Sequence, residues 1–332
     1  MPAKPKIGFY WCASCGGCEE AIVDFAEDIL GVLEAVDIVF WPCAMDFKKE
    51  DVESLPDGGI AATLLNGAIR TSEQEEMARL LRRKSTYLIA YGACAHMGGI
   101  PGLANQFSRE ELLRYVYEEC PTVVNPNHTR PAPSFTNKAG HPLSLPELRN
   151  VVRSLDQVVE VDYYVPGCPP TPKITKAALE ALLKGQLPPK GTVLAPDIAL
   201  CEQCPRKASK PTNLSFAGFK RPHLTATDPE LCLLAQGIVC MGPATRAGCE
   251  AVCICGNMPC TGCFGPTSRV RDHGAKMLSS LCANVAPKQT KEINEVLAGI
   301  PDAVGTFYRY GLPTSLLRRK VDLPMNNGKE AR

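Results

Sequence analysis

The chain has 332 residues, enough for two domains and a substantial buried core. Its formal net charge of +1 gives no basic field for nucleic acid and no polybasic stretch for a membrane surface. It has neither an apolar run of the about 18 residues that a transmembrane helix needs nor a signal-peptide pattern, so we expect a cytoplasmic protein. Because that compartment keeps thiols reduced, the 17 cysteines favour metal ligation over disulfide bonds.

The first 185 or so residues alternate strand-like and helix-like patterns. Short apolar runs predict strands in KIGFYW, VDIVFW, IAATLLNGA, STYLIAYGA and VDYYVPG. Helices are predicted between them in EEAIVDFAEDILGVLEAV and in SEQEEMARLLRRK, which begins with acids and ends with bases. The first helix would bury one apolar stripe, made of Ile22, Val23, Ala26, Ile29, Leu30 and Leu33. This alternation predicts a parallel, doubly wound sheet.

The rest of the chain has less regular patterns. Residues 119–150 are rich in proline and lack periodicity, which predicts a long ordered loop or an interface arm, with disorder as the alternative. QLPPKGTVLAPDIA predicts a linker near residue 190, and the region after it has frequent cysteines and needs metal to fold. RDHGAKMLSSLCANV and KEINEVLAGI predict helices, and the polar tail MNNGKEAR is expected to be disordered.

A dispersed set of cysteines lies at the ends of predicted strands. Cys12, Cys15 and Cys18 follow the first strand, Cys94 the fourth and Cys168 the fifth. Ligands of open α/β sheets gather beyond the carboxyl ends of the strands, so these sites can converge. The pair formed by Cys15 and Cys18 can chelate one iron–sulfur cluster, with Cys94 and Cys168 completing four thiolates. Cys12 is either an alternative ligand, a redox-active neighbour or a plain strand-end thiol.

A dense set of cysteines occupies the second half of the chain. Its eight predicted ligands suffice for two four-iron clusters and are Cys201, Cys204, Cys232, Cys240, Cys249, Cys253, Cys260 and Cys263. The simplest partition takes the first four and then the last four, while a crossed partition of the ferredoxin type stays open. We treat Cys255 as a spare because Cys253 has the more regular spacing from Cys249.

Zinc ribbons are the alternative to iron–sulfur clusters, since they use similar cysteine pairs. The many cysteines, with no histidine among the predicted ligands of the dense block, favour iron–sulfur. His96 could hydrogen-bond a cluster sulfide or be an ordinary loop residue, and His223 is not needed as a ligand. Three further cysteines are expected to be small buried apolar residues: Cys43, Cys120 and Cys282.

Motifs for chemistry on a substrate are missing from the sequence. CASCGGC puts cysteines where a dinucleotide site needs small residues, and the sequence has neither a nucleophile elbow nor a paired-carboxylate signature. We therefore expect a chain that carries electrons and binds no substrate of its own.

Several motifs together resemble the small subunit of [NiFe] hydrogenases: CASCGGCEEAIVDF, IVFWPCAMDFKKED, NGAIRTSEQ, YGACAHMGGIPGLANQF and VPGCPPTP. LCLLAQGIVCMGPATRAGC and NMPCTGCFGP resemble the cytoplasmic group that includes the F420-non-reducing (methyl viologen-reducing) hydrogenases. The similarity covers roughly residues 5 to 270. One departure is Ser14, where many such subunits carry a glutamate that serves proton transfer.

This resemblance implies a flavodoxin-like domain (1–188) with a proximal [4Fe-4S] cluster on Cys15, Cys18, Cys94 and Cys168. It also implies a ferredoxin-like domain (189–270) with two [4Fe-4S] clusters, followed by a helical extension and tail (271–332). Hydrogen would be oxidised at the nickel–iron centre of a separate large subunit. Electrons would leave through an iron–sulfur delta subunit to a heterodisulfide reductase-type flavoenzyme. The alternative is the same relay docked to a large subunit without nickel and fed by another donor.

Overall fold

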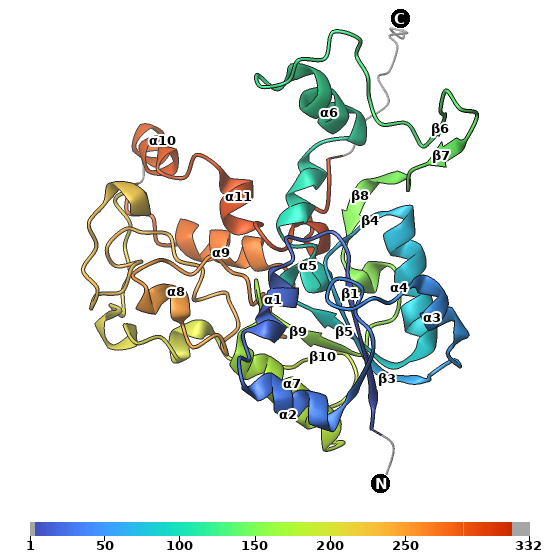
Figure 1. The fold of residues 1–332 in the computed structure, drawn as a ribbon. Coiled ribbons are helices and arrows are strands. Elements are labelled where there is room, and N and C mark those ends of the chain that lie inside the picture. The colour runs from blue at the N-terminus through green and yellow to red at the C-terminus, as the bar shows by residue number, and fades with distance from the viewer. Residues whose placement is uncertain (1–3, 288, 321–332) are drawn as a thin grey trace, which may run out of the picture.

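The computed structural model describes residues 4–287 and 289–320, so the polar tail MNNGKEAR lies outside the described residues. Its centre is a parallel sheet of six strands in the order β10-β9-β5-β3-β1-β2 (Figure 1). Counted along the chain, this is the 2-1-3-4-5 order of flavodoxin-type sheets with a sixth strand at the edge. The strands are β1 (Lys6–Trp11), β2 (Asp37–Phe40), β3 (Ile60–Asn66), β5 (Ser85–Tyr91), β9 (Tyr163–Val165) and β10 (Thr192–Val193).

Helices cover both faces of the sheet, as the sequence predicts for a doubly wound fold (Figure 1). One face packs against α1 (Gly17–Val23), α2 (Asp28–Ala35) and α7 (Pro172–Leu183). The other face packs against α3 (Lys49–Ser54) and α4 (Ser72–Lys84). α4 begins with a capping box in which Thr71 and Gln74 bond each other's backbone N–H groups. β3 is buried along nearly its whole length because it lies in the middle of the sheet.

The structure corrects the prediction of one continuous helix after the first strand. The chain breaks between α1 and α2, where Ala26 has a φ of 50° in the left-handed region. After this break the second helix restarts with a different face toward the sheet, so Ile29 and Val32 pack on the core. Leu30, on the predicted stripe, is 63 % exposed, and Val23 and Leu33 are exposed as well.

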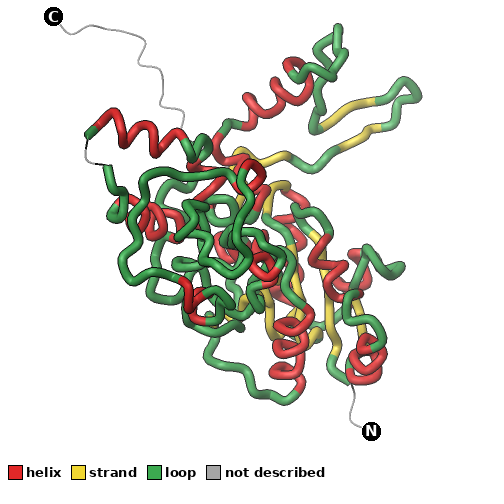
Figure 2. The backbone as a smooth tube through the Cα atoms, turned by 90° about the vertical axis from the view of Figure 1, so that its left-hand side faces the viewer, coloured by secondary structure: helices red, strands yellow, loops and turns green. Residues whose placement is uncertain are grey.

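Residues 107–147 form an arm that projects beyond the sheet (Figures 1 and 2). The arm contains α6 (Arg109–Arg114), a π-helical turn (Tyr115–Glu119) and a hairpin of β6 (Ser134–Thr136) and β7 (Pro142–Ser144). At its root, β8 (Leu148–Arg153) pairs antiparallel with β4 (Ile69–Thr71). The predicted ordered loop or interface arm is therefore an ordered, projecting segment.

The segment predicted as a linker near residue 190 is not only a linker. β10 pairs in parallel with β9, so the sheet continues past residue 188. The lobe that follows contains mostly loops and short turns (Figure 2). Its helices are α8 (Val252–Cys255), α9 (His273–Cys282), α10 (Thr290–Ala298) and α11 (Ala303–Phe307). The lobe has its own core, centred on Leu234, Ile238, Met241, Ile254 and Met277. None of the helices in the described ranges is long and apolar enough to cross a membrane.

Candidate metal centres

The dispersed cysteines converge beyond the carboxyl ends of the strands. Cys15 and Cys18 lie at the start of α1, Cys94 lies in α5 (Ala93–Met97) directly after β5, and Cys168 follows β9. Burial raises the pKa of the Cys18 thiol, and negative charge on Cys94, Cys168 and Cys15 raises it further. The same causes raise the pKa of Cys94 to about 12. The four thiols are thus close enough to oppose each other's ionisation.

Two glycines make room around these sulfur atoms. Gly92 and Gly99 both have positive φ, of 87° and 58°. A Cβ atom added at Gly92 would collide with Sγ of Cys18, and one at Gly99 would collide with Sγ of Cys94. Backbone therefore approaches the thiols where a side chain could not, as the glycines beside cluster cysteines allow.

A second group of thiols lines a cavity of about 240 Å³ beside the first group. The cysteines around this cavity are Cys168, Cys249, Cys253, Cys260 and Cys263. Burial raises the pKa of the Cys263 thiol to about 12, with negative charge on Cys168, Cys249 and Cys253 adding to the effect. The backbone of Cys168 lies close enough to the Cys263 thiol to lower its pKa slightly, so the two groups meet at this point.

A third group lies deeper in the C-terminal lobe. Burial raises the pKa of the Cys201 thiol to about 12; the positive charge of Lys210 opposes this, and negative charge on Cys240, Cys204 and Cys232 adds to it. A Cβ atom at Gly242 would lie 3.4 Å from Sγ of Cys201 and 3.6 Å from Sγ of Cys240, so these two sulfur atoms face one glycine. Burial raises the pKa of the Cys260 thiol, and negative charge on Cys240 raises it further.

These groups fit iron–sulfur clusters on the chemistry of their donors. Buried thiols that raise each other's pKa cannot all ionise unless a cation compensates their charge. Iron supplies such charge in a four-thiolate cluster, and the glycines leave space beside the sulfur atoms. Within residues 4–287 and 289–320, no three His, Cys, Asp or Glu side chains are grouped so as to hold a single metal ion.

Several cysteines outside the three groups differ from expectation. Cys43 and Cys282 are exposed and Cys120 is partly exposed, so the prediction that they are buried is wrong. A single cysteine in an apolar stretch does not reveal which side of the chain faces solvent. Cys12 is buried at the end of β1, as a strand-end thiol would be, and Cys255 is exposed.

The two histidines considered from the sequence take different positions. His96 is largely buried, its ring lies 4.7 Å from that of Tyr164, and its Nδ1 is buried with no hydrogen-bond partner among the described residues. Burial lowers the pKa of His96 to about 4, with a smaller contribution from Arg246. His223 lines a separate cavity of about 370 Å³ that also reaches Cys260.

Sequence reasoning missed a polar network next to the first group. Glu19 follows Cys18 directly, is buried, and accepts hydrogen bonds from the Trp41 indole and the Asn66 amide. Ser14, the residue that replaces the expected glutamate, donates to Oδ1 of Asn66 at 3.1 Å. The signal available in the sequence was an acid directly after a ligand cysteine. A buried carboxylate therefore lies near the first group although position 14 has none.

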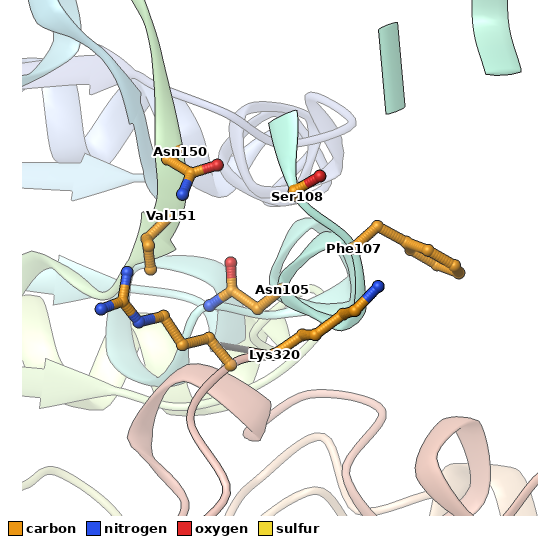
Figure 3. A pocket seen from close by; sticks show the side chains of 7 residues that line it. Asn105, Phe107, Ser108, Asn150, Val151 and Lys320 are labelled. Carbon is orange, nitrogen blue, oxygen red and sulfur yellow. The ribbon is translucent and has the colours of Figure 1, made fainter. Parts of the chain in front are cut away.

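A further pocket lies away from the cysteines, where the arm meets the end of the described chain. It has a volume of about 180 Å³. Figure 3 shows Asn105, Ser108 and Asn150 at its wall, with Lys320 beside them. The Asn105 amide donates to the carbonyls of Val152 and Arg318. These two hydrogen bonds hold the arm root and the C-terminal segment together.

Comparisons with known proteins agree on one family. The model of the family described as NADH ubiquinone oxidoreductase, 20 Kd subunit, matches residues 15–182. The chain is 38% identical to an iron-sulfur subunit of the F420-non-reducing hydrogenase of Archaeoglobus profundus, over 95% of this chain and 98% of that protein. It is also 38% identical to a subunit of the F420-non-reducing hydrogenase of Methanocaldococcus jannaschii, over 95% of this chain and 98% of that one.

The fold also resembles that of a solved structure. A chain of the recombinant [NiFeSe] hydrogenase from Desulfovibrio vulgaris Hildenborough superposes with a TM-score of 0.52 at 16% identity. The match covers 81% of this chain and 96% of that chain. At this identity the likeness extends to the fold alone.

Proposed function

Because the chain belongs to the family of the NADH ubiquinone oxidoreductase 20 kDa subunit and, within it, to the small subunits of F420-non-reducing hydrogenases, we propose that it is the electron-transfer subunit of a cytoplasmic [NiFe] hydrogenase. Membership makes it an oxidoreductase subunit whose catalytic site lies in the large subunit. Iron–sulfur clusters bound to the chain would accept and donate single electrons. The chain's own thiols would hold three [4Fe-4S] clusters.

The ligand assignment follows the three groups of thiols. The proximal set is Cys15, Cys18, Cys94 and Cys168. The medial set is Cys249, Cys253, Cys260 and Cys263, and the distal set is Cys201, Cys204, Cys232 and Cys240. The observation that supports this order is the proximity of the sets: Cys263 and Cys168 line one cavity, and negative charge on Cys240 raises the pKa of the Cys260 thiol. The medial set, which comes last in the sequence, would thus lie in the middle of the electron path.

The domain assignment is also part of the proposal. Residues 1–188 would be the flavodoxin-like domain, to whose sheet β10 adds an edge strand, 189–270 a ferredoxin-like domain and 271–332 a helical extension. The separate cores of the sheet and of the C-terminal lobe support two cluster-binding units. Electrons would pass from the large subunit to the proximal set and leave from the distal set. An iron–sulfur delta subunit and a heterodisulfide reductase-type flavoenzyme would receive them.

Metal content of the complex tests the function. We expect about twelve irons for each copy of this chain and one nickel in the complex purified without oxygen. The same iron without nickel would make the chain a relay for another donor. Zinc in place of iron would remove the electron path altogether.

A pair of cysteine variants tests the ligand assignment. Cys94→Ala should remove one proximal ligand and abolish electron flow from hydrogen to methyl viologen, while Cys282→Ala, at an exposed cysteine outside the three groups, should leave it intact. Equal activity of the Cys94 variant and the wild type would contradict the assignment.

A further inference from the structure

Arg70 carries a buried positive charge that the described residues do not neutralise. The side chain belongs to β4 and is 8% exposed, with Nη1 fully buried and unpartnered. Within residues 4–287 and 289–320, its guanidinium group makes no hydrogen bond and no ion pair. Burial lowers the pKa of Arg70, and the positive charge of Arg109 adds to this. An uncompensated buried charge of this kind is strongly unfavourable.

Two acids near the arm root, Glu75 and Glu147, are already engaged by other arginines. Glu75 binds Arg79 at 2.9 Å, Arg153 at 2.7 Å and Arg149 at 3.4 Å. Glu147 binds Arg149 at 2.7 Å and Arg109 at 3.5 Å. This ion-pair network thus has two carboxylates for four arginines before Arg70 is counted. Neither of these carboxylates pairs with Arg70.

The surface beside Arg70 has the character of a protein-binding face. The neighbouring arm exposes large apolar side chains, among them Tyr115 at 55% and Val116 at 49%. On its hairpin, Phe135 and Leu143 are cross-strand partners and are 63% and 52% exposed. Clustered exposed apolar side chains indicate a surface that another protein covers. A small free ion bound at Arg70 would leave these apolar side chains exposed to water, whereas a protein could cover them.

The position of β4 identifies which protein approaches. Ala68, one residue before β4, packs against Cys94 of the proximal set, and the arm root lies at the same edge of the sheet (Figure 1). Under the proposed function, on which this step rests, the large subunit delivers electrons at that edge. We propose that Arg70, supported by Arg109, binds an Asp or Glu carboxylate of the large subunit, which docks between the proximal thiols and the arm. A guanidinium fork suits a carboxylate because it can donate two parallel hydrogen bonds.

The test compares dissociation of the anaerobically purified complex in three variants. Arg70→Met removes the charge and should raise the dissociation constant for the large subunit at least about 30-fold, the lower bound for truncating one side of a buried charge pair. Arg70→Lys keeps the charge without the fork and should fall between wild type and Arg70→Met. Arg79→Met, which removes an exposed arginine of the same network, should stay within about threefold of the wild type.

Three outcomes would overturn the proposal. The first is an Arg70→Met complex that dissociates like the wild type. The second is an Arg70→Lys complex as weak as Arg70→Met together with faster hydrogen exchange in β4 and β8, which would assign Arg70 to the fold. The third is a free anion: sulfate at millimolar concentration would then raise the melting temperature of the wild-type complex only, with equal dissociation constants in all variants. Nickel analysis of the same samples reports on the proposed function separately.

Discussion

The hydroxyl group of Thr245 lies between a medial-set cysteine and the partly buried His273. Burial raises the pKa of the Cys260 thiol, and a hydrogen bond from Thr245 opposes that rise. In the structure the same hydroxyl donates its one proton to the carbonyl oxygen of Met241 at 2.7 Å and lies 3.1 Å from Nε2 of His273, so it must rotate to donate to the Cys260 sulfur. Hydrogen bonds to cluster sulfur atoms stabilise the more negative, reduced state. After that rotation, Thr245 would raise the reduction potential of a cluster bound by Cys260.

The replacement Thr245→Val should therefore lower the midpoint potential of one cluster and leave the other two unchanged. Electron paramagnetic resonance during a redox titration of the intact complex would measure it. Thr261→Val is the matched control, because the Thr261 hydroxyl is directed to that of Tyr310 at 3.1 Å. A shift of all three signals, or of none, would contradict this role.

His273 makes the stability of the protein depend on pH. Burial lowers the pKa of His273 to about 4 from the ordinary value of 6.5. The unfolded chain therefore binds a proton between these values and the folded chain does not, so the free energy of unfolding is greatest above pH 6.5 and decreases as pH falls toward 4. The slope is up to about 1.4 kcal/mol per pH unit for one such histidine.

Melting temperatures between pH 7.5 and 5.5 would show this dependence. The variant His273→Gln should lose part of the slope, whereas His141→Gln, at an exposed histidine of the arm, should keep it. An unchanged slope in His273→Gln would assign the pH dependence to other groups, of which the buried His96 is the first.

At the scale of elements, the two helices after β1 contribute very differently to stability. Ile22 in α1 is 3% exposed and packs on the sheet, whereas Leu30 in α2 faces solvent. Ile22→Ala should lower the free energy of unfolding by about 2–5 kcal/mol, the usual cost of such a cavity. Leu30→Ala should change it by less than about 0.5 kcal/mol. Denaturant titration of both variants checks the difference. Equal losses of unfolding free energy would favour the prediction of one helix that buries both Ile22 and Leu30.

The same two helices show how much of the fold can be predicted from the sequence. Five strands were predictable because each is a short apolar run bounded by glycine, proline or cysteine, and their parallel arrangement follows from the intervening helices. The break at Ala26 was not predictable from the sequence, because alanine gives no turn signal and its left-handed φ is set by tertiary packing. β10 was missed for a related reason: two residues in a proline-rich stretch carry no period.

The candidate site was predictable in part for similar reasons. Strand ends bring distant cysteines such as Cys94 and Cys168 to one edge of the sheet, so the first group could be argued from topology. The lobe has no such rule, and the neighbourhood of Cys168 and Cys263 depends on loops that sequence spacing does not fix. Glu19, Thr245 and Arg70 were missed because their roles depend on burial and partners.

At the scale of the whole molecule, the sheet and the C-terminal lobe should differ in their need for metal. The sheet is closed by a continuous apolar core, while thiols of the medial and distal sets take part in the core of the lobe. Removing iron with an anaerobic chelator should speed hydrogen exchange in residues 200–265 and leave β3 and β5 protected. Uniform exchange across both regions would contradict a metal-dependent lobe.

The contact between the Cys263 thiol and the backbone of Cys168 also bears on timing. It keeps the proximal and medial sets adjacent across the boundary between sheet and lobe, so we expect no hinge closure on the microsecond-to-millisecond scale before electron passage there. Tunnelling across this boundary should therefore proceed at the same rate in glycerol as in water. Viscosity would slow only steps in which separate proteins must meet.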